Sequence, residues 1–224
     1  MSVLRRGSGQ AGFSFVELVV SMAIMLAVAG SMFGFVDSAR HVFEIDLERA
    51  DMQQRARVST DALFRELVMA GAGLQTPAVA PYRRGDNNPD VPGTAFADRI
   101  SIRYVPPDAT DAITITYALR TDASGVPQLT RYDGRATDLP VVDQIVDLRF
   151  EYFGTTGQPI ALERFTDGPW VPDAVAADRY DADLDAISRV RAVVRVRPAR
   201  VFADLRIADL DAAIDVSPRN LNLQ

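Results

Sequence analysis

The sequence predicts an α+β chain, in which one long N-terminal helix precedes an antiparallel β-sheet domain. Residues 13–36 are almost entirely apolar, and residues 37–70 contain neither proline nor glycine. Both features favour a continuous helix, which we expect to end at about Ala70. Residues 99–224 contain several runs in which apolar and polar side chains alternate, which is typical of strands. The proline- and glycine-rich residues 74–98 are predicted to form a loop between the two parts.

Composition excludes several classes of function. The 224 residues include no cysteine, so a disulfide scaffold, a thiolate nucleophile and a cysteine zinc site are excluded. The one histidine, His41, cannot build a multi-histidine metal site. The net charge of -6 argues against a protein that binds phosphate backbones, so nucleic acid is not an expected partner.

The first half of the predicted helix is long enough to cross a bilayer. Leu18 to Val36 is a run of 19 residues without a charged side chain. Arg5 and Arg6 precede this run, and basic residues keep their end of a membrane helix in the cytoplasm. We therefore predict a single-pass membrane protein whose C-terminal domain lies outside the cytoplasm.

Two simpler interpretations of this N-terminus are open. A secretory signal peptide would be cleaved near the small residues Ala27 to Gly30, although the apolar run continues to Val36. A plain signal anchor requires only basic residues followed by an apolar run. Neither interpretation explains Glu17, a carboxylate at the start of the apolar run that would cost about 2.5–3.5 kcal/mol near the bilayer centre.

Cleavage after Gly12 would give Glu17 a partner. The new N-terminus at Phe13 would carry a positively charged amine one helical turn from Glu17. The amine of a neighbouring copy could then neutralise the carboxylate within lipid. Such an ion pair would form only when subunits stack in register.

Gly12, Phe13 and Glu17, with the basic pair in the leader and the apolar helix behind, resemble the cleavage and methylation motif of type IV prepilins and type II secretion pseudopilins. The basic pair lies six residues before Gly12 rather than directly against it. The resemblance implies that a prepilin peptidase removes residues 1–12 and methylates Phe13, and that Glu17 guides assembly. It also implies a pilin fold and packing of membrane helices through Leu18, Val19, Met22, Ile24, Met25 and Leu26. The implied partners are the peptidase, other minor and major pilins, an inner-membrane assembly platform and inner-membrane lipid.

Residues 37–73 are predicted to continue the helix in amphipathic form. An apolar stripe is expected to pack on the domain, with Gly71 and Gly73 ending the helix. The stripe consists of Ala56, Thr60, Leu63, Phe64, Leu67 and Val68.

The strand-rich part, residues 99–224, is called the headpiece here. Residues 99–105, 113–119 and 128–132 are predicted to form an antiparallel meander, followed by one longer strand over residues 141–152. A last strand over residues 189–197 has one apolar and one arginine-rich face. We expect this arginine-rich face to be solvated beside cross-strand carboxylates. A stripe that binds anions or nucleic acid is the alternative interpretation.

Asp181, Asp183 and Asp185 alternate in an acidic loop and offer hard oxygen ligands of the kind that calcium takes. The EF-hand pattern is not met, and a solvated acidic loop is the other interpretation. No other cofactor is expected. The sequence also contains no recognisable catalytic motif, so we do not expect an enzyme.

The later part of the headpiece resembles PilW-like minor pilins and the related J-type pseudopilins of type II secretion. The resemblance rests on strand 142–153, Trp170, strand 187–196 and the ending Pro218 to Leu221. It implies a minor pilin that primes or caps a type IV pilus, or a J-type pseudopilin of a secretion tip complex. A membrane-anchored periplasmic binding domain, with residues 167–185 as its ligand site, is the alternative from another class.

Overall fold

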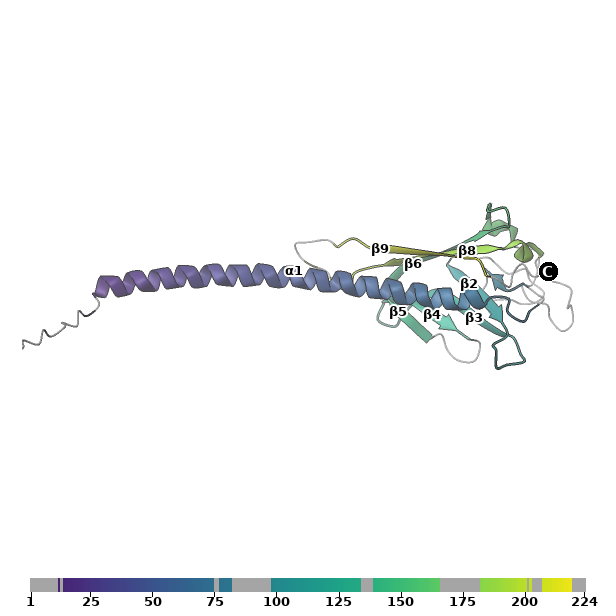
Figure 1. Ribbon diagram of the computed structural model, residues 1–224, viewed down its shortest axis with the longest axis horizontal. Coiled ribbons are helices and arrows are strands. Elements are labelled where there is room, and N and C mark those ends of the chain that lie inside the picture. Colours follow the sequence, from purple (N-terminus) through teal and green to yellow (C-terminus); the bar gives the residue numbers. More distant parts are fainter. Residues whose placement is uncertain are drawn as a thin grey trace, which may run out of the picture. The chain divides into compact units, whose positions relative to one another are not determined.

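The computed structural model describes residues 12, 14–74, 77–81, 98–133, 139–165, 182–200, 202 and 207–218. The chain divides into two compact units, Met1–Leu47 and Glu48–Gln224. Helix α1 (Phe15–Met69) contributes residues to both units, and all described strands belong to the second (Figure 1). The predicted α+β architecture, a long helix followed by antiparallel sheets, is confirmed.

Two glycines follow the last turn of α1, as the sequence predicts. Gly71 and Gly73 have φ angles of 81° and 70°, which L-residues with a side chain rarely adopt. The Gly71 N–H donates to the carbonyl oxygen of Arg103 at 2.9 Å, which directs the chain onto the first sheet. A Cβ at Gly73 would lie 3.0 Å from the Cβ of Val105, so a side chain would also be crowded there.

The first sheet is an antiparallel meander with the strand order β1-β2-β3-β4-β5. Its strands are β1 (Val79–Ala80), β2 (Arg99–Tyr104), β3 (Ile113–Thr121), β4 (Pro127–Tyr132) and β5 (Leu139–Asp143). The predicted three-strand meander is therefore confirmed as β2, β3 and β4. Strand β1 lies within the segment that was predicted to be a loop.

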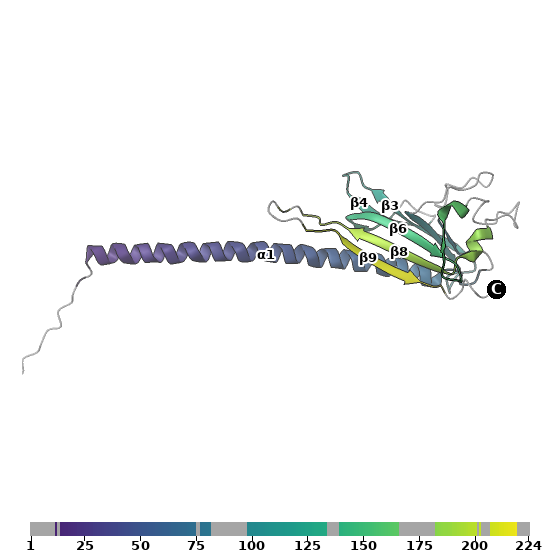
Figure 2. The same ribbon diagram turned by 90° about the horizontal axis from the view of Figure 1, so that it is seen from above.

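The second sheet is also antiparallel and has the order β7-β6-β8-β9. Its strands are β6 (Ile145–Phe153), β7 (Pro159–Ile160), β8 (Arg189–Val196) and β9 (Leu210–Val216). Two short 3₁₀ helices, η1 (Leu162–Arg164) and η2 (Ala182–Ala186), lie between β7 and β8 in the sequence. Figure 2 shows β6, β8 and β9 side by side in this order.

The prediction of one long strand over residues 141–152 is wrong. Gln144 has a φ angle of 59°, which interrupts the extended backbone between β5 and β6. The Gln144 carbonyl accepts a hydrogen bond from the Arg197 N–H at 2.9 Å, just after β8. Because β5 and β6 belong to different sheets, the single sheet expected from the sequence is two sheets joined at this residue.

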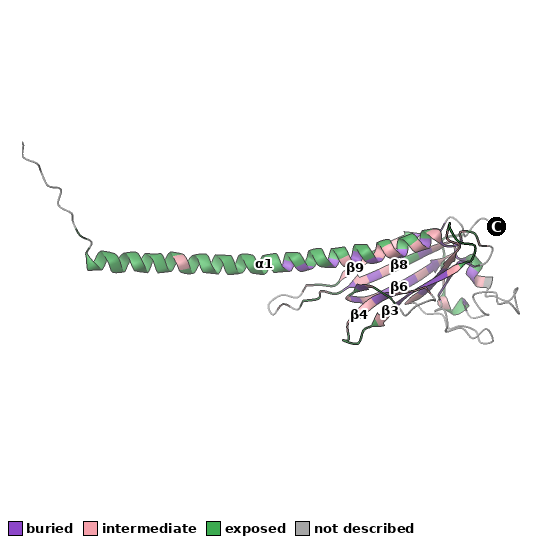
Figure 3. Cartoon of the chain, turned by 90° about the horizontal axis from the view of Figure 1, so that it is seen from below, coloured by how far each residue is buried: buried purple, intermediate pink, exposed green. Residues whose placement is uncertain are grey.

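The core of the second unit lies between α1 and both sheets. In this unit the buried apolar side chains of α1 are Met52, Ala56, Leu63 and Leu67, and Ala70, directly after the helix, is also buried. Figure 3 shows the resulting alternation of buried and exposed residues along this part of the helix. The predicted stripe is wrong for Phe64 and Val68, which are 49% and 36% exposed, because their direction on the helix differs from that of Leu63 and Leu67.

A half-buried ionic cluster, the Glu66 clamp, also holds α1 to the first sheet. Glu66 accepts a hydrogen bond from the Tyr104 hydroxyl at 2.7 Å and from the Arg131 guanidinium at 3.0 Å. Burial, followed by the hydrogen bond to Glu66, raises the pKa of Tyr104 to about 12. Burial lowers the pKa of Arg131, but the charge of Glu66, its hydrogen bond and the two nearby tyrosines together outweigh burial, and the net pKa is raised. The clamp connects three segments far apart in the sequence, through α1, β2 and β4.

Candidate functional site

The candidate site is the N-terminal segment that contains Gly12, Phe13 and Glu17. Gly12 is exposed, and a Cβ added to it would meet nothing within 4 Å. Packing among the described residues therefore gives no reason for a glycine at this position. Recognition by a processing enzyme would give one, since a residue without a side chain admits close approach to the peptide backbone. Phe13 lies outside the described residues.

Ser14 caps the first turn of α1. Its Oγ accepts a hydrogen bond from the Glu17 N–H at 3.2 Å, and its carbonyl accepts one from the Leu18 N–H at 3.1 Å. Ser14 and Glu17 have the Ser-x-x-Glu spacing of a capping box, a signal that the sequence interpretation missed. A carboxylate in the first turn is also favoured by the helix dipole. Glu17 therefore has a local structural role, from which any role in assembly must be separated by experiment.

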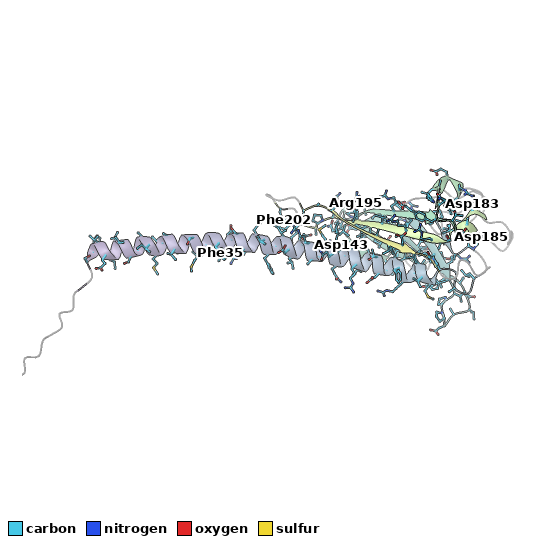
Figure 4. The ribbon with its side chains drawn as sticks, turned by 45° about the horizontal axis from the view of Figure 1, so that its top comes forward. Phe35, Asp143, Asp183, Asp185, Arg195 and Phe202 are labelled. Atoms are coloured by element: carbon cyan, nitrogen blue, oxygen red, sulfur yellow. The ribbon has the colours of Figure 1, made fainter. Side chains whose placement is uncertain are left out.

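The helix after Glu17 exposes its apolar side chains in every direction. All six residues predicted to pack between membrane helices are exposed: Leu18, Val19, Met22, Ile24, Met25 and Leu26. Phe35, labelled in Figure 4, is 76% exposed. Among the described residues, α1 is the one helix long and apolar enough to cross a membrane, judged by length and composition. An apolar surface of this extent is far larger than water-soluble monomers expose, and it fits contact with lipid or other helices.

The hydroxyl groups in this part of α1 are satisfied by the helix itself. Ser21 donates to the Glu17 carbonyl at 2.8 Å, Ser31 to the Val28 carbonyl at 2.8 Å, and Ser38 to the Gly34 carbonyl at 3.0 Å. Hydrogen bonds of this kind need no water. Serine is therefore compatible with a hydrocarbon environment at these positions.

The structure places the calcium candidates only in part. Asp183 and Asp185 lie on η2 (Figure 4). The Asp183 carboxylate accepts a hydrogen bond from Arg164. Asp181 lies outside the described residues. Within the part of the chain that the structure describes, no group of three acidic, histidine or cysteine side chains could hold a metal. Calcium binding stays a prediction, which melting curves with and without millimolar calcium would test.

The arginine-rich face of β8 lies beside carboxylates of the two neighbouring strands, as the sequence predicted. Arg195 contacts Asp211 on β9 at 2.7 Å, and this hydrogen bond lowers the pKa of Asp211 (Figure 4 labels Arg195). Arg191 lies between Glu151 on β6 and Asp215 on β9, at 4.0 and 3.7 Å. Opposite charges thus alternate across the exposed face of the second sheet. This pairing argues against an arginine stripe that is available for phosphates.

Comparison with known proteins bears on the same N-terminal segment. Residues 7–33 match the family described as the prokaryotic N-terminal methylation motif. No curated protein matches the chain.

The matched residues include Gly12, Glu17 and the first part of the membrane-spanning candidate. Together with the α+β architecture, the motif supports a protein like the type IV pilins and pseudopilins. It implies processing by a prepilin peptidase and assembly with other pilins, and it favours a structural protein over an enzyme. The apolar helix and the motif fit a single-pass anchor in the inner membrane.

Proposed function

We propose that this protein is a PilW-like minor pilin, which is processed by a prepilin peptidase and then primes or caps a type IV pilus. The observation that carries the proposal is the methylation motif at residues 7–33, placed at the start of a helix that is exposed and apolar in its first half. The amphipathic second half of the same helix is anchored in a folded domain. This combination suits a subunit that waits in the membrane and presents a folded domain to the periplasm.

In the proposed mechanism, the peptidase cleaves after Gly12 and methylates Phe13. Removal of the leader takes away the basic residues Arg5 and Arg6, which hold the N-terminus at the cytoplasmic surface. The apolar first half of α1 then keeps the subunit in the bilayer. Glu17 attracts the Phe13 amine of a neighbouring subunit, and this pairing sets the axial register of the two helices in a medium of low dielectric constant.

The proposed partners follow from this mechanism. They are the prepilin peptidase, the inner-membrane assembly platform and other minor and major pilins. Residues Leu18 to Leu26 would pack against the corresponding helices of those pilins. The headpiece would remain in the periplasm and finally lie at the tip of the filament.

The test must separate the charge of Glu17 from its capping role. Glu17→Gln removes the charge but keeps a side chain that suits the capping box. Ser14→Ala removes the capping oxygen and leaves the carboxylate, and it weakens the first turn by about 1 kcal/mol. We expect Glu17→Gln to be cleaved normally and yet to be poorly incorporated into filaments, whereas Ser14→Ala is incorporated almost normally. Cleavage is read by intact mass, and incorporation is read by immunoblotting of sheared filaments.

Two outcomes would contradict the proposal. Normal incorporation of Glu17→Gln would remove the assembly role of the charge. An equal defect in Ser14→Ala would assign the effect to the helix cap.

A further inference from the structure

The two sheets have four edge strands among the described residues, and three of them are poorly suited to pairing with another chain. β1 and β7 contain only two residues each. β5 contains Pro140, which has no N–H to donate, and its pairing with β4 is interrupted by a register shift. Short strands, prolines and irregularities are the usual features that keep a sheet edge from pairing with another chain.

The fourth edge strand, β9, lacks these features. It contains seven residues without proline or glycine, and its register with β8 runs without a shift from Leu210 to Val216. Its side chains alternate: Leu210, Ala212, Ile214 and Val216 pack on the core, and Asp211, Ala213 and Asp215 are exposed. No described strand pairs with its outer edge. A long, regular edge of this kind can accept an added strand.

The strand that already pairs with β9 defines which sequence this edge accepts. In β8, Arg191 lies opposite Asp215 and Arg195 lies opposite Asp211. Ala192 and Val194 lie between them and point to the core, where both are buried. A strand on the outer edge would face the same two aspartates, again four residues apart, and the same apolar floor. Such a strand would therefore need five consecutive residues in the order basic, apolar, any residue, apolar, basic.

A groove lies beside the first residue of β9, at one end of the proposed edge. It lies between α1 and the residues at the start of β9, has a volume of about 400 Å³, and is lined by Met52, Gln53, Ile207 and Leu210 among others. Glu48, which is buried, accepts a hydrogen bond from the Ala199 N–H at 2.6 Å. This bond ties the segment after β8 to α1.

The aspartates of β9 indicate whether its outer edge pairs better with a second copy of β9 or with a strand of different sequence. If two β9 strands paired in antiparallel fashion about Ala213, Asp211 of each would face Asp215 of the other. Like charges that lie directly opposite destabilise a strand pair. Pairing of β9 with itself is thus disfavoured, and pairing with a basic strand is favoured.

We propose that the outer edge of β9 binds an extended segment of a neighbouring subunit that carries arginine or lysine at two positions four residues apart. This inference deepens the proposed function, since it gives the headpiece a surface for a partner in the assembly. The partner's segment extends the second sheet by one strand. Its basic residues face Asp211 and Asp215, and its alternate apolar residues lie on the same side of the sheet as Ala212 and Ile214.

The sequence of β8 supplies a direct probe. A fluorescent peptide of residues 189–197, Arg-Val-Arg-Ala-Val-Val-Arg-Val-Arg, is titrated with the full chain in detergent micelles and followed by anisotropy. A scrambled peptide of the same composition controls for simple attraction to a chain of net charge -6. We expect saturable binding of the first peptide, and binding of the scrambled peptide that is weaker by about ten-fold or more.

Two proline variants locate the binding edge. Along an edge strand, alternate residues direct their N–H toward the paired strand and toward the open side. Proline has no backbone N–H. One of the two variants Ala212→Pro and Ala213→Pro therefore removes a backbone hydrogen bond to β8, and the other removes an N–H donor on the open edge. We expect one variant to lower the melting temperature, and the other to melt normally but to bind the peptide about ten-fold less tightly.

Three results would overturn the inference. The first is equal binding of the scrambled peptide, and the second is unchanged binding to the proline variant that melts normally. The third is a dimer of the full chain that the same proline disrupts, which would assign the edge to a second copy. Peptide binding does not depend on processing at Gly12, so a failure here is distinguishable from a failure of the proposed function. Glu17→Gln should bind the peptide normally.

Discussion

The two halves of α1 are both rich in apolar residues, but among the described residues only the second half buries most of its apolar stripe against the rest of the chain. Met52, Leu63 and Leu67 are buried in the core of the second unit. In the described residues up to Leu47, nearly every large apolar side chain is exposed, and beyond Leu47 the exposed ones are only Val58, Phe64, Val68 and Leu139. The second half is therefore stabilised by folding, and the first half requires a bilayer or the helices of other subunits.

Because the two halves differ in burial, mutations in them should affect different properties of the protein. Changes in the second half of α1 should alter the free energy of unfolding. Changes in the first half should alter membrane insertion and assembly, with little effect on unfolding of the headpiece.

Neighbouring residues of α1 give the largest contrast. Leu63 is fully buried and Phe64 is 49% exposed. Leu63→Ala should lower the free energy of unfolding by about 3 kcal/mol, because it removes buried surface and leaves a cavity. Phe64→Ala should cost less than about 1 kcal/mol. Urea denaturation of the full chain in detergent measures both, and equal costs would contradict the described orientation of the helix.

Arginine substitutions test which part of the first unit lies in the hydrocarbon of the bilayer and which part lies in water. Leu26 lies within the apolar run and Leu47 lies beyond it, and both are exposed. Leu26→Arg should oppose membrane insertion by about 3 kcal/mol, since a charge near the centre of the helix must enter hydrocarbon. Leu47→Arg should leave insertion unchanged. The measurement is the fraction of protein that resists alkaline extraction from membranes, and loss of both variants from the membrane would contradict the assigned span.

The Glu66 clamp should contribute to stability more than a surface ion pair does. Glu66→Gln removes the charge that faces the half-buried Arg131 guanidinium, 29% exposed in its side chain, and should cost about 2 kcal/mol. Asp61→Asn is the matched control, because its pair with Arg57 is exposed and spans 3.8 Å. This control should cost less than about 0.5 kcal/mol. An equal effect of the two variants on the urea midpoint would show that the clamp adds nothing.

The smallest effect is expected at alkaline pH. The pKa of Tyr104 is raised from 10.0 to about 12 in the folded chain, so the folded state holds this proton where the unfolded state loses it. The stabilisation that comes from this raised pKa is fully present below pH 10 and is lost as the pH rises toward 12. Burial also raises the pKa of Tyr117, which adds to the loss. Tyr104→Phe should reduce, but not remove, this fall in the urea midpoint, and an identical fall in the variant would exclude Tyr104 as a cause.

Local patterns in the sequence predicted much of the fold. Alternation identified β2, β3, β4 and β8, and Gly71 and Gly73 marked the end of α1 to within one or two residues. Strand β9 was missed because its sequence contains two adjacent alanines, which carry little strand preference. The break at Gln144 was missed because the residues on both sides favour strands, and the left-handed backbone there depends on which sheet each strand joins.

The candidate site was predicted from short-range spacing alone. Gly12, Phe13 and Glu17 are close in sequence, and so are Ser14 and Glu17, whose capping box could have been found in the same way. The Glu66 clamp could not have been found, because its members are 38 and 65 residues apart and meet only in the folded chain. Nor could alternation in β8 alone show that each arginine has an aspartate opposite it on β9.

The central claim is that the first half of α1 is the processed assembly segment of a pilin. It is tested most directly by the intact mass and N-terminal sequence of the protein recovered from its native membrane, compared with a strain that lacks the prepilin peptidase. We predict a chain that begins at methylated Phe13 in the native strain and retains residues 1–12 in the deficient strain. A chain that begins at Met1 or Ser2 in both strains would contradict the claim and leave an ordinary membrane-anchored domain.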